Sequence, residues 1–137
     1  MIVVDTGVLY GAADRSDRHH HASAELLATA PGRLWVPTTV VTETSWMIES
    51  RLGPAAEAAF LREVTTGASL TRIDLDTPDW TRSIELIDTY ADLGLGLVDA
   101  SVVAIAERLG VTTIATVNPR EFRVVRPVHC DAFELVP

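Results

Sequence analysis

The stretch MIVVDTGVLYG, residues 1–11, sets the architecture of this chain. Ile2, Val3 and Val4 form an apolar, β-branched run without alternation, which is typical of a short strand buried on both faces of a parallel sheet. Asp5 ends this run with an ionisable carboxyl group, and a second apolar stretch follows Thr6 and Gly7. A buried carboxylate is costly unless it is paired, protonated or bound to a cation, so Asp5 is a candidate functional residue.

Strand-like and helix-like segments alternate along the rest of the chain. Strands are expected at 2–5, 34–37, 69–75 and 112–116, with a short fifth strand at 124–127 or 133–136. Helices are expected at 8–13, 23–29, 38–50, 55–64, 77–91 and 99–109. This alternation predicts an α/β fold, a three-layer sandwich whose central, mainly parallel sheet of four to five strands is flanked by helices. Because no repeat or linker divides the sequence, residues 1–137 are expected to form a single domain.

Charge and composition limit the classes of partner. The net charge of −8 argues against a nucleic-acid partner, although all eleven basic residues are Arg, whose planar guanidinium suits phosphate. Acids concentrated at one metal site would make the net charge a poor guide. The single Cys130 cannot form an internal disulfide, and no segment resembles a secretion leader or a membrane span. We therefore expect a soluble, cytoplasmic protein without a membrane partner.

Two acids lie on helical segments whose neighbours are apolar. Glu43 shares a helix face with Val40, Trp46 and Met47, so we expect its carboxylate to face the interior, either paired with a distant Arg or bound to a cation. Asp99 begins the segment DASVVAIAERLG, and its neighbours one turn along are apolar too. An N-cap role is the alternative for Asp99, as it is for Asp5.

The fourth expected strand ends in IATVNPREF, which places Thr116 and Asn118 at a carboxyl end of the sheet. Asn118 before Pro119 is also an ordinary turn signal. Taken together, however, Asp5, Glu43, Asp99 and Asn118 are expected at the same edge of the sheet, where parallel sheets bind ligands. Carboxylate and amide oxygens are the ligands that Mg²⁺ or Mn²⁺ prefers, and a divalent cation would offset the repulsion between the acids.

The chain resembles the PIN-domain ribonucleases, specifically the toxins of VapBC-type toxin–antitoxin pairs. The resemblance covers nearly the whole length. It rests on IVVDTGVLYG at the start, TTVVTET around Glu43, YADLGLGLVDASVVAIAERLG around Asp99 and IATVNPREFRVVRP near the end. It implies a PIN-like fold.

The resemblance also assigns roles to residues. Asp5, Glu43 and Asp99 match the three acids of the family, which hold the metal ion, and Thr6 matches its usual Thr or Ser. Where the family often has a fourth acid in a T-x-D-x-x-F pattern, this chain has Thr116 followed by Asn118. An amide adds no negative charge, so a second ion should bind more weakly here.

Asp92 is a possible substitute for the missing acid, and an exposed acid at a helix end is the simpler interpretation of that residue. The basic cluster Arg120, Arg123 and Arg126 could contact the RNA backbone or, alternatively, acids on a protein surface.

The implied activity is hydrolysis of RNA phosphodiester bonds with a carboxylate-bound Mg²⁺ or Mn²⁺ ion. The catalytic residues would be Asp5, Glu43, Asp99 and Asn118. The family further implies a homodimer and a cognate antitoxin protein.

The sequence has two other interpretations. The tripeptide DTG at residues 5–7 also marks aspartic proteases, but those enzymes pair two copies in β-rich lobes, whereas here it occurs once among helical patterns. The more serious alternative is a PIN-like module that has lost turnover and binds RNA or protein, because Asn118 stands where the family often has an acid.

Overall fold

The computed structural model describes residues 1–30 and 33–137 of the chain. Within these residues, five strands form one parallel sheet in the order β3-β2-β1-β4-β5. The strands are β1 (Ile2–Val4), β2 (Leu34–Pro37), β3 (Leu70–Ile73), β4 (Thr113–Ala115) and β5 (Glu134–Val136). The helices are α1 (Thr6–Ala13), α2 (His20–Thr29), α3 (Thr38–Leu52), α4 (Pro54–Thr66), α5 (Thr77–Thr89), α6 (Leu97–Leu109) and α7 (Pro119–Val124), with the short 3-10 helix η1 (Ala91–Leu93) before α6.

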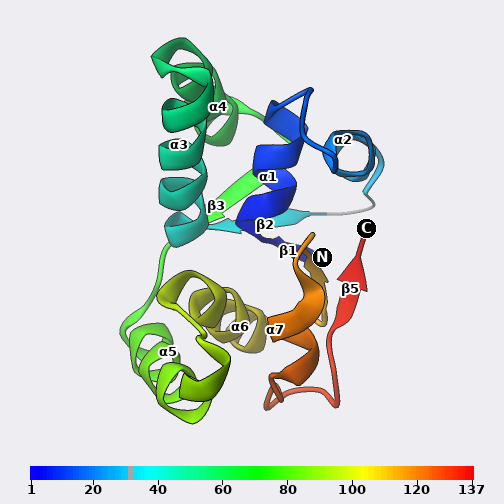
Figure 1. Ribbon diagram of the computed structural model, residues 1–137. Helices are drawn as coiled ribbons and strands as arrows, with labels where there is room; N and C mark the ends of the chain where they lie inside the picture. The colour runs from blue at the N-terminus through cyan, green and yellow to red at the C-terminus, as the bar shows by residue number, and fades with distance from the viewer. Residues whose placement is uncertain (31–32) are drawn as a thin grey trace.

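Helices cover both faces of the sheet, so the predicted three-layer sandwich is confirmed (Figure 1). Helices α1 to α4 connect β1, β2 and β3 on one face, and α5, α6 and α7 lie on the other. Connections between parallel strands are right-handed. The chain adds strands in one direction from β1 to β3 and in the other direction from β3 to β4 and β5, so the two sets of connecting helices lie on opposite faces. The reversal lies between β1 and β4, and ligands of open parallel sheets bind at the carboxyl ends of such strands.

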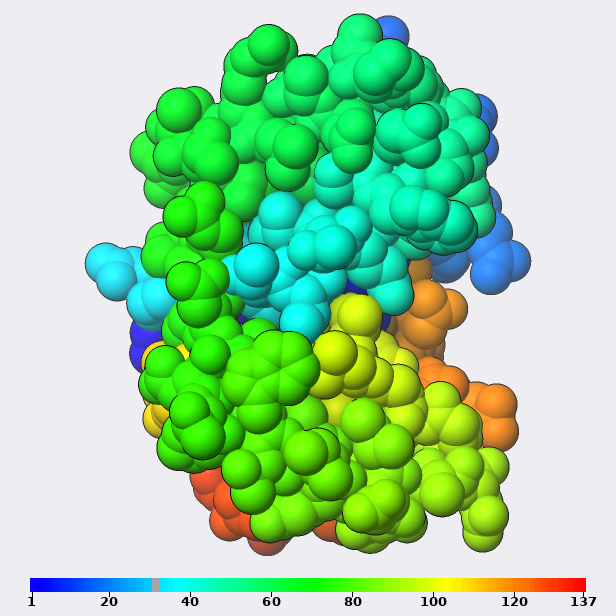
Figure 2. Space-filling model, turned by 90° about the vertical axis from the view of Figure 1, so that its left-hand side faces the viewer, coloured from blue at the N-terminus to red at the C-terminus, as the bar shows by residue number. Residues whose placement is uncertain are grey.

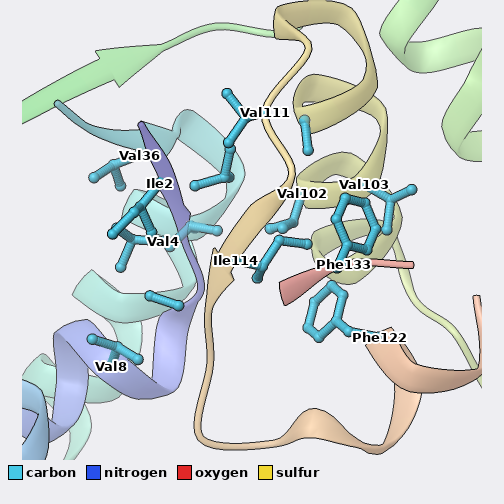
Figure 3. Packing of buried hydrophobic residues seen from close by; sticks show 14 of the residues in the cluster. Ile2, Val4, Val8, Val36, Val102, Val103, Val111, Ile114, Phe122 and Phe133 are labelled. Atoms are coloured by element: carbon cyan, nitrogen blue, oxygen red, sulfur yellow. The ribbon is translucent and has the colours of Figure 1, made fainter. Parts of the chain in front are cut away.

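The strand at the start of the chain is fully buried, as its composition predicts. Val3 and Val4 are 0% exposed and pair with Ile114 and Ala115 of β4. Figure 3 shows this side of the sheet, with Val102 of α6 packed beside Ile114. Burying a side chain of this size stabilises the fold by roughly 1.5–3 kcal/mol. The core therefore fixes the carboxyl ends of β1 and β4 next to each other.

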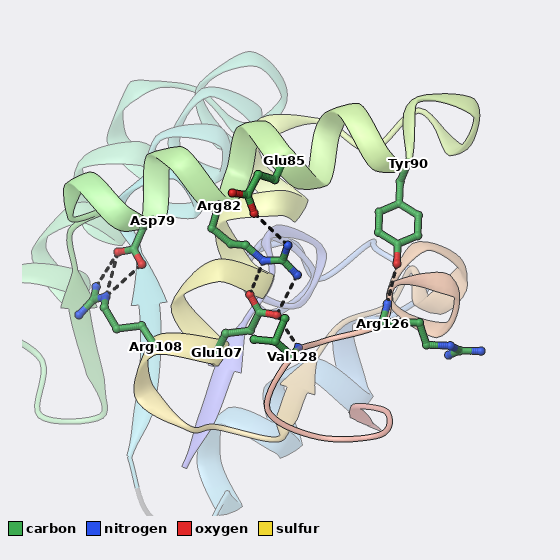
Figure 4. A network of polar contacts seen from close by, with 8 residues as sticks. All are labelled: Asp79, Arg82, Glu85, Tyr90, Glu107, Arg108, Arg126 and Val128. Carbon is green, nitrogen blue, oxygen red and sulfur yellow. Dashed lines mark hydrogen bonds and ion pairs between the residues drawn. The ribbon is translucent and has the colours of Figure 1, made fainter.

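Ion pairs hold α5 against α6, and a hydrogen bond joins α6 to the chain after α7 (Figure 4). Arg108 binds both carboxylate oxygens of the buried Asp79, with Nε 3.1 Å from Oδ1 and 2.9 Å from Oδ2. Arg82 Nε donates to Glu107 Oε1 at 2.8 Å, and Glu107 Oε2 accepts the backbone N–H of Val128 at 2.7 Å. These contacts fix the position of α6.

Most boundaries fall within a few residues of those expected from the sequence. Of the two candidates for a fifth strand, 133–136 is correct and contains β5, whereas 124–127 begins with the last residue of α7. Helix α7 was not predicted, because its six residues follow a turn signal and are too few for a periodic pattern. Helix α5 is capped by Asp76, whose carboxylate forms a capping box with Asp79. No helix in residues 1–30 and 33–137 has the length and apolarity to cross a membrane.

Candidate functional site

A pocket of about 970 Å³ opens at the carboxyl ends of β1 and β4. Its wall is built from the β1–α1 junction, the middle of α3, the start of α6 and the β4–α7 junction. The polar and charged residues that line it are Asp5, Thr6, Glu43, Asp99, Asn118, Arg120, Glu121 and Arg123. The structure thus brings the four expected site residues Asp5, Glu43, Asp99 and Asn118 to one place.

Asp5 is the most buried acid of the pocket, with 5% of its surface exposed. It occupies the N-cap position of α1, but its side chain makes no capping hydrogen bond. Instead, Oδ2 accepts a hydrogen bond from the Thr116 hydroxyl at 3.0 Å. Burial raises the pKa of Asp5 above its usual 3.8, and the negative charges of Glu43 and Glu121 add to the rise. The capping interpretation therefore does not explain this residue.

Asp99 lies in the first turn of α6, three residues after the N-cap Gly96, so it is not the cap of that helix. Its carboxyl group is half-buried. Burial raises its pKa from 3.8 to about 7, with further contributions from the charges of Asp5, Glu121 and Glu43. At neutral pH this group is therefore poised between its protonated and ionised forms, as acids in functional sites often are.

Glu43 reaches the pocket, but the expectation that it lies on the apolar face of its helix is wrong. The buried residues of α3 are Val40, Val41, Thr44, Ser45 and Ile48, whereas Glu43 and Trp46 are exposed. Trp46 has the periodicity of a core residue but is 67% exposed, so its position does not mark a buried helix face. Glu43 therefore stands at the rim of the pocket in contact with solvent.

The β4–α7 junction contributes a connected set of polar groups. Thr116 is buried, donates to Asp5 and accepts the backbone N–H of Asn118 at 3.0 Å. Asn118 is the N-cap residue of α7 and is exposed, without a side-chain capping bond. Because the backbone of Asn118 is held through Thr116 to Asp5, the loop and the first acid form one unit.

The remaining predicted residues lie at or beyond the rim. Arg120 and Arg123 are exposed and line the pocket. Arg126 does not line it, and its backbone N–H donates to the Tyr90 hydroxyl at 2.9 Å. Asp92 is exposed on η1 and is not part of the pocket wall, so the structure gives it no place as a substitute acid.

Two features of the pocket were not anticipated from the sequence. Glu121 lines it and is close enough to raise the pKa values of Asp5 and Asp99. It follows the expected site residue Asn118 by three positions, and this closeness in sequence is the signal that could have identified it. The Thr6 hydroxyl is buried without a hydrogen-bond partner in the part of the chain that the structure describes. A buried hydroxyl without a partner is costly, which indicates that a water or a ligand contacts it.

The donor set suits a hard cation that retains water. Over the described ranges, no three His, Cys, Asp or Glu side chains come close enough together to enclose an ion. The acids therefore line the pocket without forming a closed cage. Mg²⁺ is usually held by one or two carboxylates and several waters, so an open, acid-lined pocket with an unpaired hydroxyl fits it.

Comparison with known proteins gives consistent matches. The model of the PIN domain family matches residues 2–126. Ribonuclease VapC26 of Mycobacterium tuberculosis is 29% identical over 136 residues, which cover 99% of this chain and 100% of that protein. The structure of VapC20 of M. tuberculosis, a sarcin–ricin loop cleaving toxin, aligns with a TM-score of 0.78 at 19% identity, over 83% of this chain and 87% of that one. VapBC2 of Rickettsia felis, bound to promoter DNA, aligns with a TM-score of 0.71 at 19% identity, over 98% and 97%. VapC20 and VapBC2 therefore have the same fold as this chain.

Proposed function

Because this chain belongs to the PIN domain family, we propose that it is a ribonuclease that acts as the toxin of a toxin–antitoxin pair. The observation that carries the proposal is the pocket at the switch between β1 and β4, where Asp5, Glu43, Asp99 and Glu121 gather. None of these four carboxylates has an ion-pair partner among the described residues. A relative that matches over the whole chain is a ribonuclease, which supports the same activity here.

The activity is proposed to depend on Mg²⁺ or Mn²⁺. Asp5 and Asp99 would hold the ion, with Glu43 completing the site, because these carboxylates share the pocket and the charges of Asp5 and Glu43 add to the burial that raises the pKa of Asp99. A bound divalent cation would lower the pKa of the attacking water and would polarise the scissile phosphate.

The residues of the chain have distinct tasks in this proposal. Asp5 is fixed by the hydrogen bond from Thr116, so its free oxygen keeps one direction in the pocket. Glu43 is exposed at the rim, where its carboxylate can accept a proton during attack on the phosphate and release it to solvent. Asn118 also lines the pocket, and its amide can orient a water without adding charge.

RNA would approach over the start of α7. Arg120 and Arg123 are exposed on the pocket wall, so their guanidinium groups can bind phosphates on either side of the scissile bond. Arg126 is exposed beyond the wall and could contact RNA only farther from the reacting phosphate. The arginines would therefore bind the phosphates of RNA, and the acids would bind the ion.

A cognate antitoxin is the proposed protein partner, since structurally similar proteins include a toxin–antitoxin complex from Klebsiella pneumoniae and VapBC2 of R. felis. The antitoxin would block cleavage in the cytoplasm, where the RNA substrate is made.

A homodimer is also proposed. Trp46 and Trp80 are 67% and 47% exposed, and both line a largely apolar groove of about 670 Å³ formed by α3, α5 and the start of α6. Figure 2 views this face, where α3, α5 and the beginning of α6 meet. Two exposed Trp side chains at one groove are typical of a surface that is covered by another protein. Sedimentation of the parent and of Trp46→Ser tests this, with a shift to monomer expected for the variant and an unchanged dimer counting against this face.

The proposed activity is tested by incubating RNA with the purified chain in Mg²⁺, in Mn²⁺ and in EDTA. We expect cleavage with either metal, none in EDTA, and none for Asp5→Asn. Glu49→Gln is the matched control, because it removes an exposed carboxylate outside the pocket and should cleave like the parent. RNA that stays intact at every metal concentration would contradict the proposal and would favour the alternative, a PIN-like binding module.

A further inference from the structure

A pair of hydroxyl groups joins the two helices that carry Glu43 and Asp99. These helices, α3 and α6, lie in different layers of the sandwich, and the start of α3 approaches α6 (Figure 1). There the Thr39 hydroxyl lies 2.6 Å from the Ser101 hydroxyl. Thr39 is four residues before Glu43 on α3, and Ser101 is two residues after Asp99 on α6. Among the residues that the structure describes, this is the one hydrogen bond between the two helices.

The neighbouring contact determines which hydroxyl is the donor. Ser101 Oγ donates its proton to the backbone carbonyl oxygen of Val98, at 2.7 Å. A hydroxyl has one proton and can accept two hydrogen bonds, so Thr39 donates its own proton to Ser101. The hydrogen bonds therefore run in one direction, from Thr39 on α3 through Ser101 to the carbonyl of the residue that precedes Asp99.

Packing alone does not explain a hydroxyl group at position 101. Ser101 is 0% exposed and lies in a row of buried Ala, Val and Ile residues on α6. Alanine is a better helix former, and a buried hydroxyl costs free energy unless it is hydrogen-bonded. Of the two hydrogen bonds of Ser101, the one to Val98 stays within α6 and the one from Thr39 comes from another layer. The bond from Thr39 is therefore the one that fixes the two helices relative to each other.

This junction borders the pocket. Val98 lines the pocket together with Glu43 and Asp99. The negative charge of Glu43 contributes to the raised pKa of Asp99, so the two carboxylates interact and their separation matters. Glu43 is exposed at the rim, and its carboxylate has no ion-pair partner in the described part of the chain. The place of Glu43 is therefore set by the position of α3 and not by contacts of its own side chain.

We propose that Thr39 and Ser101 form a positioning pair, which holds the start of α3 against α6 and so keeps the Glu43 carboxylate in place beside Asp99. This inference rests on the proposed function, in which Asp5 and Asp99 hold the ion and Glu43 accepts a proton during attack on the phosphate. Loss of the pair would displace Glu43 and would leave the other acids and the arginines of α7 where they are. It should therefore slow the chemical step more than it weakens the binding of metal or RNA.

The test compares Thr39→Val with the parent in RNA cleavage at saturating Mn²⁺. Valine has nearly the shape of threonine but cannot donate a hydrogen bond, and Ser101 keeps its bond to Val98 in this variant. We expect kcat to fall by about 10-fold, because a misplacement of about 1 Å can cost about 100-fold. KM for RNA and the Mn²⁺ dissociation constant from calorimetry should both stay within about 3-fold of the parent. Thr39→Ser keeps the hydroxyl and should restore most of kcat.

Thr42→Val is the matched control. Thr42 lies on the same helix and lines the same apolar groove as Thr39, but its hydroxyl donates to the Thr38 carbonyl within α3, at 3.0 Å. This variant should cleave like the parent. Ser101→Ala should lower kcat at least as much as Thr39→Val does. Combining these two substitutions should add no loss beyond that of Ser101→Ala, because both remove the same hydrogen bond.

Amide hydrogen exchange without metal or RNA measures the link between the helices itself. We expect faster exchange over residues 42–48 of α3 in Thr39→Val, because this helix would lose a contact with another element. Thr42→Val should exchange like the parent over the rest of the same segment.

The outcomes separate this proposal from the proposed function. An unchanged kcat or unchanged exchange in Thr39→Val would refute the positioning pair, and the nuclease would stand. Equal losses of kcat and Mn²⁺ affinity, or additive losses in the double variant, would count against the pair in the same way. If the parent itself cleaves no RNA with either metal, both the proposed function and this inference fail.

Discussion

Replacing Asp99 by Asn should stabilise the metal-free protein at neutral and alkaline pH. In the folded chain, burial and neighbouring acids raise the pKa of Asp99 from 3.8 to about 7. This rise corresponds to about 4 kcal/mol of unfavourable free energy when the group is ionised, at 1.36 kcal/mol for each pKa unit. Because Asp99 keeps part of its surface in water, screening should leave about 2 kcal/mol.

The sign of the effect depends on pH in a defined way. Below pH 3.8 the carboxyl group is neutral in both the folded and the unfolded chain, so it contributes no difference. Between pH 3.8 and about 7 the unfolded chain has released its proton while the folded chain retains it, so the stability of the parent falls as pH rises. Above pH 7 Asp99 is ionised in the folded chain as well, so the full unfavourable free energy of its ionisation is present. Asn carries no charge, so the advantage of the variant should grow across this window.

Urea unfolding in EDTA at pH 4, 6 and 8, followed by circular dichroism, measures this difference. We expect the parent and Asp99→Asn to have similar free energies of unfolding at pH 4, and the variant to be about 2 kcal/mol more stable at pH 8. Asp88→Asn is the control, because Asp88 is exposed and outside the pocket. A variant that is equally stable or less stable at pH 8, or a gain that does not change with pH, would refute the reasoning.

Three further predictions follow from the site and its supports. Asn118→Asp should increase RNA cleavage at low Mg²⁺, by about 10-fold if the residue faces the ion, and an unchanged metal dependence would leave it a turn residue. Gly7→Ala should lower the free energy of unfolding by about 1–3 kcal/mol, because its Cβ would overlap the side chain of Val117 in the loop after β4. Gly96→Ala is the control in denaturant unfolding, because a Cβ there meets no atom within 4 Å. Arg108→Ala should cost about 3 kcal/mol, since Asp79 is 2% exposed and would lose its cation, and a loss below about 1 kcal/mol in the same assay would contradict that estimate.

The sheet was predictable because its signals are local. The buried run at 2–4 and the apolar strand at 34–37 need no knowledge of the rest of the chain, and alternation with helices then fixes the parallel topology. The carboxyl-end position of Asp5 follows from the same pattern.

The orientation of side chains on helices was harder to predict. The spacing around Glu43 fitted an apolar face that included Trp46, but α3 packs through Val40, Thr44 and Ile48 instead. An aromatic residue in a groove at the surface has the same periodicity as one in the core, so the sequence alone does not separate the two cases.

Glu121 was missed for a different reason. It lies in an Arg-rich segment that resembles a solvated surface, and α7 is too short to show periodicity. Only the assembled fold brings the start of α7 beside Asp5 and Asp99. The order of the strands brings these residues together, and their spacing in the sequence does not show it.

The central claim is that a divalent cation binds in the pocket at the carboxyl ends of β1 and β4, beside Asp5 and Asp99. A crystal of this chain grown with Mn²⁺, examined by anomalous scattering, tests it most directly. The account predicts a manganese peak in the pocket, bound by Asp5 and Asp99, with Glu43 and Glu121 oriented toward it. A pocket that holds no manganese at millimolar concentration, with these carboxyl groups turned to solvent or hydrogen-bonded to one another, would contradict it.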